Sequence, residues 1–190
     1  MPTVVLTGFG PFSGVECNPA REGVLEAGMS LYTDPGVRLV VEILPVEFER
    51  ARRRLQQLAA DVRPDLWLSF GVAANRTAVT PERWGHNVQD ARVPDNAGAQ
   101  PRGTAVEDGG PAKVPATLPN DEIVAALREA GFDAEPSDSA GEFVCNTVLY
   151  TALRTLAGSG VPVGFVHLPG AIERPAEAVK TAVRVAIAAR

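Results

Sequence analysis

The stretch TVVLTG, residues 3–8, decides the fold class because its β-branched and apolar residues run directly into a glycine. Such a run is typical of a buried strand that leads into a loop. Further segments of the same character lie along the chain: RLVVEILP (38–45), LWLSFG (66–71) and VPVGFVHL (161–168). We therefore expect a sheet built from these strands at the centre of the molecule.

Helical patterns separate and follow the predicted strands. Helices are expected at about 19–29, 47–62, 121–130, 143–157 and 175–189. Asn18, just before Pro19, is the predicted N-cap of the first helix, and Asn120 is that of the third. This alternation predicts one α/β domain over residues 1–190, a three-layer α/β/α sandwich around a mostly parallel twisted sheet. In such sheets the active site lies in loops at the carboxyl ends of the strands.

The middle of the chain has a different composition. Residues 72–119 carry many prolines and glycines, which predicts short strands and long ordered loops rather than a second domain. Arg50, Arg52, Arg53 and Arg54 form a basic cluster, but they fall at helical spacing among glutamates. That spacing is typical of a solvated helix face, with Glu49 able to pair with Arg53.

Composition and charge exclude several classes of protein. The net charge of −5 argues against a nucleic-acid partner, since such binding needs a basic surface. No apolar run is long enough to span a bilayer, and the first residues lack the features of a signal peptide. We expect a cytoplasmic protein without a membrane partner.

Cysteines and histidines are few. The cysteines are Cys17 and Cys145, without a Cys-x-x-Cys pattern, and the histidines are His86 and His167. A disulfide framework or a cysteine-rich zinc site is therefore not expected, and no His-x-x-x-His pattern supports a metal. We predict no metal and no cofactor, and any imidazole chemistry must use one of the two histidines.

Cys145 follows the small residues Ser139-Ala140-Gly141 and opens a predicted helix. In the first turn of a helix the positive end of the dipole favours the thiolate, which would make Cys145 a nucleophile. The alternative is a buried apolar residue, because Cys145, Leu149, Ala152 and Leu156 share one helical stripe. Spacing alone leaves both interpretations open.

The acid–base candidates are equally open at this stage. His167 lies at the carboxyl end of an apolar strand, where it fits a general base or a hydrogen-bonded structural histidine. Glu82 and Asp95 lie in the polar middle segment near arginines, and any one carboxylate there is more often a surface or ion-pair residue.

Taken together, these segments resemble the type I pyroglutamyl peptidases, also called pyrrolidone-carboxylate peptidases. Matching blocks in the family's order are VVLTGFGPFSGVECNPA (4–20), RTAVTPERWGHNVQDARVPDNAGAQP (76–101), SAGEFVCNTVLY (139–150) and GFVHLP (164–169). The resemblance implies a cysteine exopeptidase, an omega peptidase that removes an N-terminal pyroglutamyl residue from peptides. It also implies a homo-oligomer, a dimer or tetramer.

The same resemblance assigns roles to residues. It implies Cys145 as nucleophile, His167 as base and Glu82 as the carboxylate that orients His167. Phe9, Phe12, Phe143 and Val144 would wall the pyroglutamyl pocket near Asn18, with Arg92 close to the reacting carbonyl. Two departures are visible: Val72 stands where many relatives have glutamine, with Asn75 as a possible replacement, and the segment 168–175 is short.

The implied chemistry suits these residues. Pyroglutamate is a flat, neutral lactam, which fits an apolar slot with a few polar groups for its N–H and C=O. Thiolate attack would give a thioacyl enzyme that water hydrolyses. A non-catalytic binding protein and a nucleoside phosphorylase-like enzyme are the competing interpretations, separated by a pyroglutamyl amide assay and a phosphorolysis assay.

Overall fold

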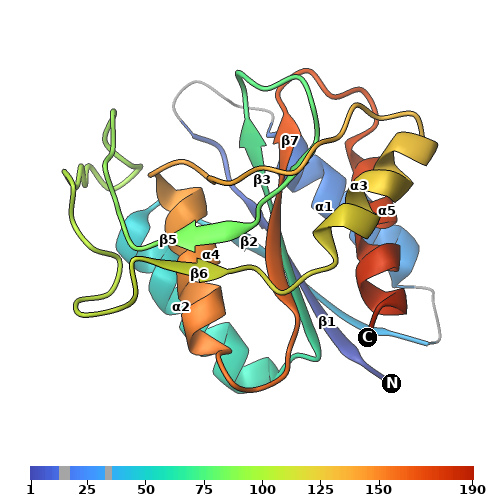
Figure 1. Ribbon diagram of the computed structural model, residues 1–190, viewed down its shortest axis with the longest axis horizontal. Helices are drawn as coiled ribbons and strands as arrows, with labels where there is room; N and C mark the ends of the chain where they lie inside the picture. Colours follow the sequence, from blue (N-terminus) through green and yellow to red (C-terminus); the bar gives the residue numbers. More distant parts are fainter. Residues whose placement is uncertain (13–17, 33–35) are drawn as a thin grey trace.

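The computed structural model (Figure 1) describes residues 1–12, 18–32 and 36–190. Its main sheet has the strand order β2-β1-β3-β7-β4. The parallel strands are β1 (Thr3–Phe9), β2 (Arg38–Leu44), β3 (Leu66–Ala73) and β7 (Val163–Pro169). The short edge strand β4 (Thr80–Pro81) runs antiparallel to β7. The predicted mostly parallel sheet is thereby confirmed.

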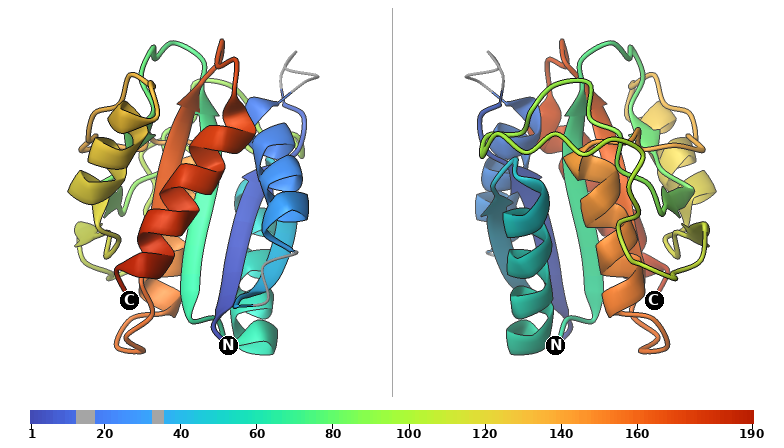
Figure 2. Two further views of the ribbon diagram at one scale, coloured as in Figure 1. Left: turned by 90° about the vertical axis from the view of Figure 1, so that its right-hand side faces the viewer. Right: turned by 90° about the vertical axis from the view of Figure 1, so that its left-hand side faces the viewer.

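Helices cover both faces of this sheet (Figure 2). One layer holds α1 (Pro19–Leu31), α3 (Asn120–Glu129) and α5 (Pro175–Ala188), and the other holds α2 (Phe48–Val62) and α4 (Val144–Thr155). Each layer has its own apolar core against the sheet, as expected for a two-faced sheet. The α/β/α sandwich predicted from the sequence is the observed architecture.

The alternation of side chains along β7 positions the chemistry. Val166 and Leu168 pack into the core under α1, α3 and α5, whereas Val163 and Phe165 pack into the core under α2 and α4. Successive side chains of a strand point to opposite faces, so His167 shares the face of Phe165. It therefore points to the layer that contains α4, the helix that carries Cys145.

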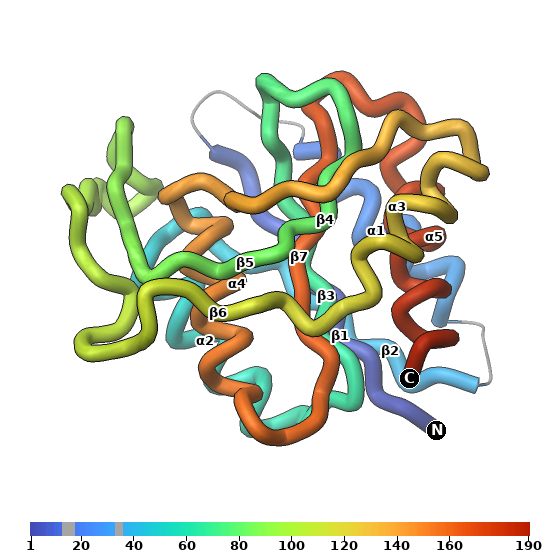
Figure 3. Tube along the Cα trace, in the orientation of Figure 1, coloured from blue at the N-terminus to red at the C-terminus, as the bar shows by residue number. Residues whose placement is uncertain are grey.

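The middle segment forms short strands and ordered loops, as predicted. A second small sheet pairs β5 (Trp84–His86) with β6 (Lys113–Pro115). The buried Asn146 of α4 fastens this region: its side chain accepts from the His86 backbone N–H and donates to the carbonyls of His86 and Val88. Figure 3 shows the loops after β3 and β7 and the segment before α4 at one end of the molecule.

The cap predictions have different outcomes. Asn18 caps α1 as predicted, since its Oδ1 accepts from the Ala20 N–H. Asn120 is not the N-cap of α3; it is the first helical residue, and Pro119 takes the cap position with its carbonyl accepting from the Ile123 N–H. The Asn120 amide instead donates to the backbone carbonyl of Glu82. This contact draws the side chain toward β4 and away from the helix end.

Candidate active site

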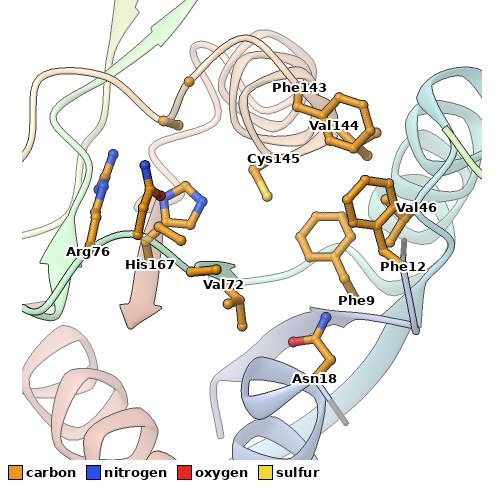
Figure 4. Close-up of a pocket in the computed structure, with 15 residues that line it drawn as sticks. Phe9, Phe12, Asn18, Val46, Val72, Arg76, Phe143, Val144, Cys145 and His167 are labelled. Atoms are coloured by element: carbon orange, nitrogen blue, oxygen red, sulfur yellow. The ribbon is translucent and has the colours of Figure 1, made fainter. Parts of the chain in front are cut away.

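Cys145 lies at the second position of α4, directly after Phe143 and Val144. Its side chain lines a cavity of about 380 Å³ at the carboxyl end of the sheet. Figure 4 shows the sulfur between a group of phenylalanine rings and His167. Cys145 is partly buried and packs against the apolar core under α4, as the alternative interpretation expects, and its role as nucleophile stays a prediction. Cys17 lies outside the described residues.

His167 and Glu82 meet because β7 and β4 are neighbours. His167 pairs with Thr80 in the antiparallel register, and the backbone N–H of Glu82 donates to the carbonyl of Phe165. The Nδ1 atom of His167 then lies 2.7 Å from Oε1 of Glu82. An ionised carboxylate can only accept, so Nδ1 carries a proton, and in the neutral imidazole Nε2 is then the nitrogen with the free lone pair. This is the arrangement that a general base requires.

Glu82 is completely buried, yet its pKa is lowered from the usual value. Burial opposes ionisation and is the largest single influence. It is outweighed by the hydrogen bond and charge of His167, the nearby Ser137 hydroxyl and the charge of Arg76. The buried Oε2 atom has no hydrogen-bond partner among the described residues. Glu82 is thus a charged carboxylate behind the histidine.

Arg76 is a site residue that spacing did not single out. It lies in the loop after β3, lines the cavity and donates from Nη1 to Oε1 of Glu82 at 2.6 Å. The same Nη1 also donates to the Thr80 hydroxyl, and Nη2 donates to the backbone carbonyl of Ser139 at 2.7 Å. Its only sequence signal was a place in a loop at the carboxyl end of a predicted strand.

The surroundings of Cys145 favour the protonated thiol. Its pKa is raised to about 12, mainly by burial and also by the charge of Glu82, while the charge of Arg76 acts in the opposite direction. This corrects the expectation that the helix start favours the thiolate, because the loss of solvent outweighs the helix dipole here. A base must therefore remove the proton as the sulfur attacks.

Alkylation of Cys145 should report this ionisation directly. In a Cys17→Ser background, we expect the rate with iodoacetamide to rise about tenfold per pH unit from about pH 7 to about pH 10, without a plateau. The measurement is the pseudo-first-order rate across that range. A rate that is already high and flat near neutral pH would instead indicate a resting thiolate paired with an imidazolium.

The residues that the family resemblance implied as an apolar wall lie at the cavity. Phe9, Phe12, Phe143 and Val144 all line the cavity, with ring centroids of Phe12 and Phe143 5.0 Å apart. Phe143 also packs edge-on against Phe48 at 5.1 Å. Asn18 lines the cavity too, although its amide already donates to the Gly10 carbonyl. Among the described lining residues none is acidic.

Arg92 is not one of the residues that line this cavity in the described part of the chain. Its side chain is exposed. Gln100 holds the backbone of this turn by donating to the carbonyls of Ala91 and Arg92. Among the described lining residues the cationic side chain is Arg76, and the role of Arg92 stays a prediction.

Of the two candidate carboxylates, Glu82 lies beside His167 and Asp95 makes other contacts. Asp95 is buried, but its Oδ2 accepts from the Phe48 N–H at the start of α2, and its Oδ1 accepts from Ala97 and Ala99. Asp95 therefore holds the loop and the start of α2.

Both Val72 and Asn75 line the cavity, so the position that departs from many relatives faces the same space as its suggested replacement.

Gly71 leaves room for the sulfur. It pairs with His167 in the sheet, and an added Cβ there would lie 2.7 Å from Phe165 Cζ and 3.0 Å from Cys145 Sγ. Phe165 in turn packs at a tilt of 48° against the imidazole of His167, with centroids 4.7 Å apart. A glycine is required at this point because strand, aromatic ring and thiol approach so closely.

Neither a candidate metal site nor a candidate membrane-spanning helix is found among the described residues. These residues contain no group of three or more His, Cys, Asp or Glu side chains that could hold a metal ion. Within the same residues, no helix combines the length and apolar character needed to cross a membrane.

Comparisons with known proteins agree on one family. A family model described as pyroglutamyl peptidase matches residues 2–187. The chain is 43% identical over 170 residues to a pyrrolidone-carboxylate peptidase of Pseudomonas fluorescens, covering 89% of this chain and 79% of that protein. It is 40% identical over 189 residues to one of Thermococcus onnurineus, covering 95% and 93%.

Solved structures give the same result. Bacillus amyloliquefaciens pyroglutamyl peptidase I matches with a TM-score of 0.91 at 31% identity, covering 99% of this chain and 98% of that chain. The pyrrolidone carboxyl peptidase of Thermococcus litoralis matches with a TM-score of 0.89 at 29% identity, covering 99% and 94%.

Proposed function

Because the chain belongs to the pyroglutamyl peptidase family, we propose that it hydrolyses the amide bond after an N-terminal pyroglutamyl residue of peptides by a cysteine mechanism. One observation carries this proposal: Cys145 and the hydrogen-bonded pair His167–Glu82 lie at one apolar cavity. The competing binding protein and phosphorylase would not need this combination.

The cavity suits a neutral lactam ring. Its phenylalanine side chains offer flat apolar contact for the ring, and Asn18 and Asn75 offer polar groups for the lactam N–H and C=O. Since no described lining residue is acidic, a substrate with a charged amine would find no counter-charge there. The neutral N-terminus of pyroglutamyl peptides avoids this penalty.

The first step transfers the thiol proton and forms the new bond. Nε2 of His167 takes the proton of Cys145 as the sulfur attacks the pyroglutamyl carbonyl carbon. Glu82 accepts from Nδ1 and stabilises the imidazolium that forms. The first-turn N–H groups of α4, which the described residues do not cap with a side chain, would donate to the oxyanion.

The second half releases both products. As the C–N bond breaks, the imidazolium returns its proton to the leaving amine, and a thioacyl enzyme remains. His167 then removes a proton from water, whose oxygen attacks the thioester. Collapse releases pyroglutamate and gives the proton back to the sulfur. A cytoplasmic location stays a prediction from the sequence, and assembly into a homodimer or homotetramer stays a prediction from the family resemblance.

Substrate choice tests this proposal. We expect kcat/KM for a pyroglutamyl amide to exceed that for the matched prolyl and glutaminyl amides by at least ~100-fold. Proline keeps the ring but lacks the lactam carbonyl and carries a charge, and glutamine carries a free ammonium group. The measurement is kcat/KM for the three amides under one condition. Comparable values for prolyl and pyroglutamyl amides would show that ring shape alone sets specificity.

Two other outcomes would contradict the proposal itself. Tight binding of a pyroglutamyl amide without turnover would indicate a binding protein. Phosphate-dependent cleavage of a nucleoside, without hydrolysis of any of the three amides, would indicate the phosphorylase-like alternative.

A further inference from the structure

One carboxylate oxygen in the site accepts from two donors. Oε1 of Glu82 lies 2.7 Å from Nδ1 of His167 and 2.6 Å from Nη1 of Arg76. The carboxylate is completely buried, and the Arg76 side chain is only 28% exposed. Charges this close and this shielded from water act strongly on one another. The imidazole therefore shares its carboxylate with a permanent cation.

The charges already balance without a proton on His167. Arg76 and Glu82 cancel, and the Cys145 thiol is neutral. An extra proton on the His167–Glu82 pair would leave a net positive charge in a buried place next to Arg76. Such a proton is bound less tightly than it would be beside a lone carboxylate, whichever of the two residues holds it.

We propose that Arg76 is a positioning residue that keeps the His167–Glu82 pair free of an extra proton near neutral pH, so that His167 is available as a base for the neutral thiol. This inference deepens the proposed function and rests on it for its catalytic meaning. A protonated thiol requires an unprotonated imidazole, and Arg76 favours that combination.

Arg76 also joins this pair to the segment before the nucleophile. Its Nη2 donates to the Ser139 carbonyl, and the Ser139 hydroxyl accepts from the Gly141 N–H. Gly141 has a positive φ of 79°, in the region that favours glycine. The guanidinium fork therefore links the carboxylate to the turn that enters α4, which a single ammonium group would not reproduce.

The neighbouring ionisable groups do not duplicate this role among the described residues. The groups that act on Glu82 are His167, Ser137 and Arg76, and those that act on the thiol are Glu82 and Arg76. Arg83 follows Glu82 directly, but it pairs with Asp121 at 3.6 Å and with Asp138 at 3.7 Å. His86 contacts the Asp138 carbonyl. Arg83 is thus a matched control, an arginine nearby in sequence that does not contact the carboxylate.

The experiment is an NMR titration of the His167 ring. The chain has two histidines, so a His86→Gln background leaves His167 as the single imidazole signal. In that background we expect Arg76→Gln to raise the titration midpoint by about one pH unit, because the opposing charge is lost. Arg76→Lys and Arg83→Gln should leave the midpoint within about 0.3 units. Circular dichroism checks the fold, and Arg76→Met replaces Arg76→Gln if the latter does not fold.

The results separate a charge effect from a structural one. An unchanged midpoint in Arg76→Gln, or equal shifts in Arg76→Gln and Arg76→Lys, would overturn the inference. The acid limb of kcat/KM should move to higher pH with the ring titration in Arg76→Gln. If the wild-type protein did not hydrolyse a pyroglutamyl amide, the proposed function would fail, while the ring titration would still decide the role of Arg76.

Discussion

Cys145→Ser is expected to lower kcat/KM for a pyroglutamyl amide by at least ~10⁴-fold, because it removes the only described thiol at the cavity. The hydroxyl has nearly the same size, so the contact with the Gly71 region is kept and the fold should survive. Serine is a far weaker nucleophile when its base is arranged for a thiol. The measurement is kcat/KM with circular dichroism and Tm on the same samples.

The matched control is Cys17→Ser, which alters the other cysteine of the chain. Because Cys17 has no assigned base partner, this variant should keep near wild-type activity. A Cys145→Ser protein within about tenfold of wild type would contradict the proposed nucleophile. Loss of activity in Cys17→Ser with retention in Cys145→Ser would exchange the two assignments.

The protonated thiol changes how the site should be understood. A resting thiolate would need a cation beside the sulfur, whereas burial here keeps the proton on Cys145. Substrate binding then brings the carbonyl to a neutral thiol next to His167. Such a site has low reactivity toward other electrophiles until its substrate is in place. The alkylation profile tests the ionisation of the Cys145 thiol, and the ring titration tests the protonation of His167.

Periodicity in the sequence predicts the frame of the site well. The apolar strands and the helices appear within a few residues of their expected bounds. Alternation in the last strand also explains why His167 faces α4, since Val163 and Phe165 pack on that side. These features depend on local patterns that repeat over several residues, so one sequence is enough to find them.

Contacts between distant segments could not be predicted in the same way. Glu82 and Asp95 have similar surroundings in the sequence, and only the pairing of β4 with β7 puts Glu82 beside His167. Arg76 reaches the site through a side chain from an irregular loop, which has no period. Spacing also could not predict the thiol pKa, because burial by residues far along the chain decides it.

Asn120 illustrates the same limit on a smaller scale. Its type and position are typical of an N-cap, but its Nδ2 donates to the carbonyl of Glu82, just after β4, and its Oδ1 has no hydrogen-bond partner among the described residues. The tertiary contact wins, and Pro119 takes the cap position. Asn18 also donates to a backbone carbonyl, that of Gly10, but its Oδ1 accepts from the Ala20 N–H, so its predicted cap is confirmed.

Substitution of the histidines is expected to give the second large effect. His167→Ala should lower kcat/KM by about 10³-fold, because it removes the base for the thiol and the acid for the leaving amine. His86→Ala is the control. Its ring contacts only the Asp138 carbonyl among the described residues, so the rate should change little.

Glu82→Gln should cost less than His167→Ala. The glutamine Oε1 can still accept from His167 Nδ1, and Arg76 would hold that oxygen in place by donating to it. What is lost is the negative charge that stabilises the imidazolium during attack. Comparing kcat/KM for the three variants, with circular dichroism to exclude unfolding, therefore separates the base from the group that orients it. An inactive His86→Ala protein beside an active His167→Ala protein would reverse the assignment of the base, and the hydrogen bond to Glu82 would then be structural.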